Sequence, residues 1–178
     1  MIRDIIQEGD SILRRQMPDV HDAKKIAQVL GDLKDTMRDS HAAGFAANQI
    51  GEEVNICLVW EAKNYASKER KIYSLVNPKI VFRSGSQQSH EGCFSIPGYI
   101  AIIPRAMKVM VACQDKLYTF TGSESRIAQH EIDHLQGILM RDYVEGTNGK
   151  SGGTLISTNY ENRPAIYQKA RKHATKEA

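Results

Sequence analysis

Two histidines separated by three residues, with a glutamate directly after the first, stand in the segment SRIAQHEIDHLQG, residues 125–137. On a helix, His130 and His134 lie on one face and can both direct an imidazole nitrogen at one metal ion. Glu131 then lies within reach of a water on that ion and can take its proton. This HExxH pattern indicates metal-assisted hydrolysis with a carboxylate as general base, although the same spacing also arises by chance on ordinary helices.

A catalytic ion of this kind needs a third protein ligand, and the segment HEGCFSIPG, residues 90–98, offers Cys93. A thiolate is a strong metal ligand, and the neighbouring Gly92 lets the backbone approach the site in a tight turn followed by a Pro-Gly pair. Taken alone, Cys93 is better interpreted as a small buried hydrophobic residue, which is how most free cysteines behave. The downstream candidates stand in no recognisable context: Asp142, Glu145, Glu161 and His173.

The helix that would carry the histidines lies between residues 122 and 137, a stretch bounded by glycines with no Gly or Pro inside it. Ser123 is the predicted N-cap, with an acidic residue directly after it in the first turn. Apolar anchors for a buried helix are supplied by Ile127, Ile132 and Leu135. A buried helix would hold both imidazoles away from bulk water.

The rest of the chain predicts an α+β fold, with antiparallel or mixed sheets packed around this central helix. Apolar residues at spacings of three and four predict an amphipathic helix over residues 22–38. Short β-rich runs broken by turn residues predict strands at 54–60, 73–82, 100–104 and 107–114, and the run ILMRDYV at 138–144 is also strand-like. A glycine-rich link and a C-terminal helix after Pro164 complete the expected order.

Length and composition favour one domain over residues 1–178, with a catalytic core at about 1–145 and the link and basic helix at 146–178. The net charge of +3 is too slight to indicate a DNA-binding protein. The longest apolar runs are too short to span a membrane, and the N-terminal segment lacks the apolar core of a signal peptide. Three cysteines without a CxxC pair favour reduced thiols. We expect a cytoplasmic monomer.

Three segments in chain order resemble the motifs of the peptide deformylase family. They are AAGFAANQIG at residues 42–51, EGCFS at 91–95 and QHEIDH at 129–134. Weaker similarity through GDSILRRQMPDV, LVNPKI and IPRAMKVMV extends it over nearly all of the first 145 residues. The sequence departs from the family pattern at Ala42, where a glycine is usual, and at Phe45 and Phe94, where aliphatic residues are usual. These departures remove no reacting group, but they can alter pocket shape.

The resemblance implies removal of the N-formyl group from the initiator methionine of newly made polypeptides, with release of formate. Cys93, His130 and His134 would hold one divalent metal ion, Fe(II) in the cell, with Zn(II), Ni(II) or Co(II) possible in the purified protein. Metal-bound hydroxide would attack the formyl carbon, with Glu131 as general base and then acid. The side-chain amide of Gln49 and the backbone N–H of Phe94 would stabilise the oxyanion.

Substrate contacts follow less directly. Gly44 lies where an extended peptide could pair with the backbone, and Phe45, Ile127 and Ala128 could line an apolar pocket for the methionine side chain. Ordinary core packing is an equally good interpretation of Ile127. Glu91 and Arg105 could form an ion pair that braces the cysteine loop or could be solvated separately. Gln129 and Asp133 belong to the third motif, where they could either orient the histidines or have a purely structural role.

Two other functions stay open at this point. A zinc endopeptidase would use the same HExxH chemistry but would not need Cys93 or Gln49, and a nascent-chain binding protein could keep the fold without turnover. The basic C-terminal helix would contact the ribosome transiently near the exit of nascent chains, or it would simply present a solvated face.

Overall fold

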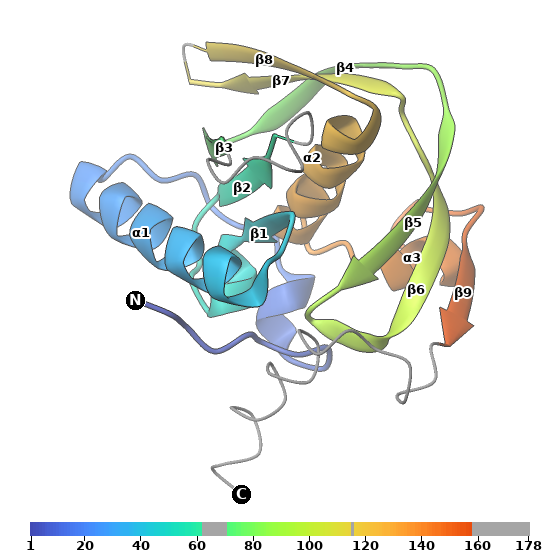
Figure 1. Cartoon of the computed structure of the whole chain (residues 1–178), viewed down its shortest axis with the longest axis horizontal. Coiled ribbons are helices and arrows are strands. Elements are labelled where there is room, and N and C mark those ends of the chain that lie inside the picture. Colours follow the sequence, from blue (N-terminus) through green and yellow to red (C-terminus); the bar gives the residue numbers. More distant parts are fainter. Residues whose placement is uncertain (62–70, 115, 158–178) are drawn as a thin grey trace, which may run out of the picture.

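The computed structural model describes residues 1–61, 71–114 and 116–157 and shows an α+β protein. Its central element is the helix α2 (Gly122–Leu135), which antiparallel sheets surround (Figure 1). The remaining helical elements are η1 (Ser11–Arg14), α1 (Ala23–Ser40), η2 (Ala47–Ile50) and α3 (Met140–Glu145). The strands are β1 (Gly44–Ala46), β2 (Ile56–Trp60), β3 (Ile72–Val76), β4 (Lys79–Ser84), β5 (Gln87–Cys93), β6 (Ile96–Arg105), β7 (Lys108–Cys113), β8 (Lys116–Thr121) and β9 (Thr154–Ser157).

The strands form three antiparallel sheets, ordered β1-β2-β3, β4-β7-β8 and β5-β6-β9. One apolar cluster packs α2 against strands of all three sheets, and a second packs α1 against β1 and β2. The predicted α+β architecture is therefore confirmed, and the described sheets are antiparallel rather than mixed. Each predicted run contains a strand, but the run at 73–82 holds two, β3 and β4, and the strands β1, β5 and β8 were not predicted. No helix in the described part of the chain has the length and apolar character needed to cross a membrane.

Helix α1 forms where the spacing of apolar residues predicted it. Asp22 caps its first turn by accepting hydrogen bonds from the backbone N–H groups of Lys24 and Lys25, at 2.8 and 3.2 Å. The helix ends at His41, whose φ of 57° is left-handed. That reversal directs the chain from α1 into β1, and it leaves His41 next to the strand that lines the cleft described below.

The expected N-cap of α2 was wrong. Ser123 lies inside the helix, and the residue that precedes the helix is Thr121, which makes no side-chain capping bond. The chain turns directly from β8 into α2 at Gly122, whose φ of 55° suits glycine and whose N–H donates to the carbonyl of Met107 at 2.8 Å. Because this turn satisfies a terminal N–H, the helix starts before Ser123.

The strand expected at 138–144 was also wrong, because this run contains helix α3. Asp142 accepts a hydrogen bond from the backbone N–H of Leu139 at 2.8 Å and receives two from the guanidinium of Arg14, at 2.7 and 2.8 Å. Burial opposes ionisation of Asp142, but these bonds outweigh it and lower its pKa. A short apolar run does not distinguish a strand from a short buried helix, whereas a carboxylate that satisfies the N-terminal amide favours the helix.

The C-terminal part of the chain is described only as far as residue 157. Strand β9 was not predicted; it is four residues long and pairs with β6, with Thr154 opposite Ile102. The helix expected after Pro164, with its basic face, lies outside the described residues.

Candidate metal centre and catalytic cleft

Helix α2 presents both histidines of the HExxH pattern toward the end of β5. His130 and His134 lie one turn apart, and their ring centroids are 4.9 Å from each other. Both side chains are buried. The helix therefore offers two imidazoles on one face, as the spacing predicted.

Cys93 is brought to the same place by the β5–β6 hairpin. It is the last residue of β5, and the register shifts between Gly92 and Cys93, so that Cys93 pairs with Ile96 across a two-residue turn. Cys93 thus lies directly before the tight turn rather than inside it, and Pro97 lies in β6. Its Sγ is 3.2 Å from Nε2 of His134. One donor atom from each of the three side chains, Cys93, His130 and His134, lies within 4.8 Å of the others.

The orientation of His130 is set by a carboxylate behind it. Glu91 accepts a hydrogen bond from Nδ1 of His130 at 2.8 Å, which leaves Nε2 as the ring atom available toward the other donors. Arg105 donates to both oxygens of the same carboxylate at 2.8 Å. Burial alone would raise the pKa of Glu91, but the adjacent guanidinium and His130 lower it to about 2. The predicted Glu91–Arg105 ion pair is therefore confirmed, and it is buried rather than solvated.

A second carboxylate extends this network to α3. Arg105 donates to Asp133 at 2.5 Å and to the hydroxyl of Tyr143 at 2.7 Å. The Tyr143 hydroxyl in turn donates to Asp133 at 2.8 Å. Gln129 has a separate duty, since its amide bonds the backbone of Ala106 at 2.9 and 3.1 Å. Asp133 and Gln129 therefore fix α2 to its surroundings and do not contact the histidine rings directly.

Glu131 is a buried carboxylate that faces the cleft. Within the described residues its Oε2 has no hydrogen-bond partner, although the atom is fully enclosed. Burial, reinforced by Glu91 and opposed by His130, raises its pKa to about 7. The strand β1 passes against this side chain: a Cβ added to Gly44 would lie 2.6 Å from Oε1 of Glu131. Glycine at position 44 therefore makes room for the carboxylate.

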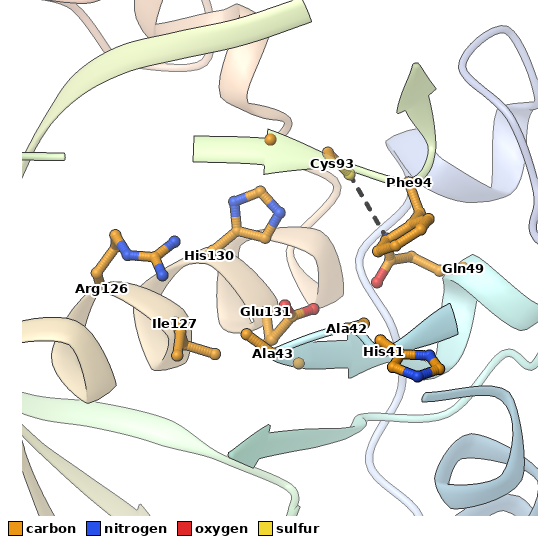
Figure 2. Close-up of a pocket in the computed structure, with 12 residues that line it drawn as sticks. His41, Ala42, Ala43, Gln49, Cys93, Phe94, Arg126, Ile127, His130 and Glu131 are labelled. Atoms are coloured by element: carbon orange, nitrogen blue, oxygen red, sulfur yellow. Dashed lines mark hydrogen bonds between the residues drawn. The ribbon is translucent and has the colours of Figure 1, made fainter. Parts of the chain in front are cut away.

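Gln49 approaches the cysteine from η2. Its Oε1 accepts the backbone N–H of Ala46 at 2.9 Å, which fixes the direction of the amide. Its Nε2 lies 3.2 Å from Oγ of Ser95 and 3.6 Å from Sγ of Cys93, the contact drawn as a dashed line in Figure 2. A nearby amide, Asn48, donates to the carbonyl of His134 at 2.6 Å. The first motif is thus attached to both the hairpin and α2.

These groups line one cleft of about 270 Å³. Figure 2 shows Cys93, His130 and Gln49 along one wall, with Ala42 and Ala43 opposite. The lining residues are His41, Ala42, Ala43, Gly44, Gln49, Gly92, Cys93, Phe94, Arg126, Ile127, His130 and Glu131. β1 lies at the edge of its sheet, so its open edge is available to an extended ligand.

Most of the predicted site residues meet in this cleft, but Phe45 does not line it. Side chains alternate along a strand, and Gly44 faces α2, so Phe45 points to the opposite side of β1. There it is fully buried beneath α1, and its ring lies 5.9 Å from that of Phe94. Ala128 likewise belongs to the core. Two lining residues, His41 and Arg126, were not predicted from the sequence.

The donor set fits a divalent transition-metal ion. A thiolate and two imidazoles are the three-ligand set that leaves one position open for water, and all three side chains here are buried. Nδ1 of His134 has no protein partner among the described residues, and Nε2 of that ring faces Cys93. The carboxylate oxygen of Glu131 without a partner is the complementary acceptor that a water in the cleft requires.

Comparison with known proteins gives a consistent result. The family described as "Polypeptide deformylase" matches residues 2–150. The peptide deformylase of Thermomicrobium roseum is 38% identical over 152 residues, covering 81% of this chain and 86% of that protein. A crystal structure of a Legionella pneumophila peptide deformylase has a TM-score of 0.72 and 29% identity, covering 97% of this chain and 92% of that one. An Acinetobacter baumannii class I type b peptide deformylase bound to Met-Ala-Ser has a TM-score of 0.70 and 27% identity, covering 80% and 98%.

Proposed function

Because this chain belongs to the peptide deformylase family, a family of metal-dependent hydrolases that remove the formyl group from nascent peptides, we propose that the cleft beside α2 is its catalytic site. The observation that carries the proposal is the convergence of Cys93, His130 and His134 on one point, with the buried carboxylate of Glu131 beside them. The hairpin supplies the thiol and α2 supplies the other three groups. The substrate is the N-formylmethionyl end of a newly made polypeptide.

Cys93, His130 and His134 would hold one divalent ion per chain. When bound, this ion would polarise the formyl carbonyl and lower the pKa of a water molecule toward neutrality. Fe(II) is the proposed ion in the cell on the family resemblance, and the same donors suit Zn(II), Ni(II) or Co(II) in purified protein. The hydrogen bond from His130 to Glu91 supports this role, because it fixes which ring nitrogen is free to bind.

Glu131 is the proposed general base and then general acid. It would take the proton of the attacking water and deliver it to the amine that leaves as formate separates. A pKa of about 7, raised chiefly by burial, suits a group that must both accept and donate a proton near neutral pH. Its unpartnered Oε2 supports the same role, since a buried acceptor in a cleft is available to a water or an amine.

Gln49 and the backbone N–H of Phe94 are the proposed oxyanion donors. The Gln49 amide carries two hydrogens, of which one reaches Ser95 and the other lies on the side of Cys93. Its direction is fixed in advance by the bond from Ala46, so little reorganisation is needed when negative charge develops. Loss of one such donor typically lowers the rate by about 10²–10³.

The formylated peptide would bind in extended form along the open edge of β1. Gly44 provides the close backbone approach, and Ile127 provides an apolar contact for the methionine side chain. Phe45 supports this wall from behind, through Phe94, rather than touching the substrate. The departures from the family pattern at Phe45 and Phe94 therefore act on the shape of the wall.

The broader assignments are also proposals. Residues 1–178 would form a single cytoplasmic domain and function as a monomer, with residues 1–145 as the catalytic core. Transient ribosome contact through the basic C-terminal helix is proposed for residues outside the described part of the chain. We propose no specific DNA binding, because a net charge of +3 over the whole chain is small.

The test is formate release from a formyl-Met-Ala-Ser peptide by protein prepared without oxygen, with bound metal quantified in the same sample. We expect turnover by the wild type, near-complete loss in Glu131→Gln with metal retained, and loss of both in Cys93→Ala. Mass spectrometry of the products distinguishes formate loss from cleavage of a peptide bond, which an endopeptidase would cause. No formate from fully metallated wild type would refute the proposal and favour a binding protein.

A further inference from the structure

Arg126 stands at one end of the cleft. It precedes His130 by four residues on α2, so both side chains lie on the same face of the helix, one turn apart. Figure 2 shows its guanidinium extended over Ile127 toward His130, while His41 lies at the opposite end of the row of labelled residues. The residue is half-buried.

The combination of partial burial with the lack of an ion pair distinguishes Arg126 from the other arginines of the described segments. Most of those pair with a carboxylate: Arg3, Arg14, Arg15, Arg105 and Arg141. Arg38 and Arg83 are unpaired in the described residues but exposed. Arg126 is the half-buried arginine there without a carboxylate at ion-pair distance. A guanidinium without a carboxylate partner is stabilised by an anion, and its planar fork matches a carboxylate.

The surroundings of Arg126 indicate which kind of anion it could bind. Glu131 is the one acidic residue that lines the cleft in the described part of the chain, and it interacts with Arg126 only at longer range. Arg126 and Ile127 both line the cleft, so a substrate side chain bound against Ile127 would have the guanidinium as a neighbour. A peptide along β1 would bring successive residues about 3.3 Å apart past this point.

We propose that Arg126 is a specificity-determining residue that binds a side-chain carboxylate of the substrate, so that the enzyme favours formyl-peptides with Asp or Glu among the two residues after formyl-methionine. This inference rests on the proposed deformylase function and names a preferred substrate class for it. It requires no new chemistry at the reacting bond. The guanidinium of Arg126 would bind the substrate carboxylate through a bidentate, charge-assisted pair of hydrogen bonds at the end of the cleft.

The experiment compares peptides that differ only in the charge of one side chain. The pairs are formyl-Met-Glu-Ser-amide against formyl-Met-Gln-Ser-amide, and formyl-Met-Ala-Glu-amide against formyl-Met-Ala-Gln-amide. We expect the wild type to prefer the acidic member of at least one pair by about 5-fold in kcat/KM, as for a partly screened ion pair. Arg126→Gln should reduce that ratio to about 1, and Arg126→Lys should retain part of it.

The controls separate this inference from the function on which it rests. Arg83→Gln removes an exposed arginine on β4, away from the cleft, and should keep the wild-type ratio. Turnover of the glutamine peptides by wild type tests the deformylase function itself, and its absence would remove both conclusions. Normal turnover with equal rates for glutamate and glutamine peptides would overturn only the role of Arg126. Weaker inhibition by added formate in Arg126→Gln, with an unchanged peptide ratio, would also overturn it, because the anion would then be the product.

Discussion

Replacing Gly44 by alanine should strongly lower the rate of catalysis while leaving the fold largely intact. The added Cβ would lie 2.6 Å from Oε1 and 2.8 Å from Cγ of Glu131, and 2.8 Å from Cγ2 of Ile127. Carbon contacts are normally about 3.5–4.0 Å, so the neighbours must move by roughly 1 Å. Both neighbours are buried on α2, and one of them is the proposed general base. The perturbation is therefore steric and local.

The magnitudes follow from that displacement. Overpacking of a buried site typically costs about 1–3 kcal/mol of stability, or a few degrees in Tm per kcal/mol for a chain of this size. A misplacement of about 1 Å in a catalytic group can lower the rate by about 10²-fold, which is about 2.7 kcal/mol in the barrier. We therefore expect Gly44→Ala to lower kcat/KM by about 10²-fold. The bound metal should be unchanged, because the atoms nearest the new Cβ belong to Glu131 and Ile127 and not to the three ligands.

The assay is formate release over a range of peptide concentrations, with Tm and metal content measured on the same preparation. Gly31→Ala is the matched control: Gly31 lies in α1, and a Cβ added there would meet no atom within 4 Å. Alanine at such a helix position should stabilise the protein by about 0.5–1 kcal/mol and leave kcat/KM unchanged. If Gly44→Ala kept wild-type kcat/KM, the argument that position 44 makes room for Glu131 would be wrong.

Three further outcomes are expected. Arg105→Met should lower the free energy of unfolding by about 3–5 kcal/mol in urea titrations, because it removes the guanidinium that pairs with two buried carboxylates, Glu91 and Asp133. The exposed Arg83→Met should have little effect, and equal losses would contradict the reasoning. Because the pKa of Asp142 is lowered in the folded protein, its carboxylate stabilises the fold fully above the ordinary pKa of 3.8, and this stabilisation is lost as pH falls through the lowered pKa. Asp142→Asn should therefore be less stable than wild type at pH 7 and should lose less stability below pH 4. Parallel curves of stability against pH for the two proteins would refute this. Removing the divalent ion with a chelator should lower Tm, because a ligand at a free concentration of 100 times its Kd stabilises the folded protein by about 2.7 kcal/mol. Adding Zn(II) should restore the Tm. A Tm that does not change with metal would argue against a buried three-ligand site.

The helices that follow a regular apolar pattern could be predicted from the sequence, and so could the residues that form motifs. The helix bearing His130 and Glu131 followed from spacing and residue type, whereas Cys93 became the third ligand only through the resemblance of three segments to the family motifs. Short elements could not be predicted in the same way: α3 and β9 span six and four residues, and both are determined by contacts with distant segments. Local propensity carries little information over so few residues.

The positions of some site residues could not be predicted from the sequence, for different reasons. The orientation of Phe45 could have been predicted, because neighbouring residues of a strand point to opposite faces and Phe45 follows Gly44. The strand β1 is only three residues long, however, and it was not predicted. Arg126 carries no signal in sequence beyond its place on α2, since whether a helical arginine is paired depends on residues that come from elsewhere in the chain. The hydrogen bonds of Tyr143 to Arg105 and Asp133 could not be predicted either, because residues 138–144 were expected to form a strand and Tyr143 lies in helix α3.

The separation of the metal donors along the chain has a consequence during the protein's own synthesis. Cys93 is made 41 residues before His134, the last of the three donors. At typical rates of about 5–20 residues per second, this interval is roughly 2–8 s, during which the thiol lacks the complete set of donors. An unliganded thiol is open to oxidation or to capture of a stray ion. Metal loading is therefore a late event, one that waits for the hairpin and the helix to meet.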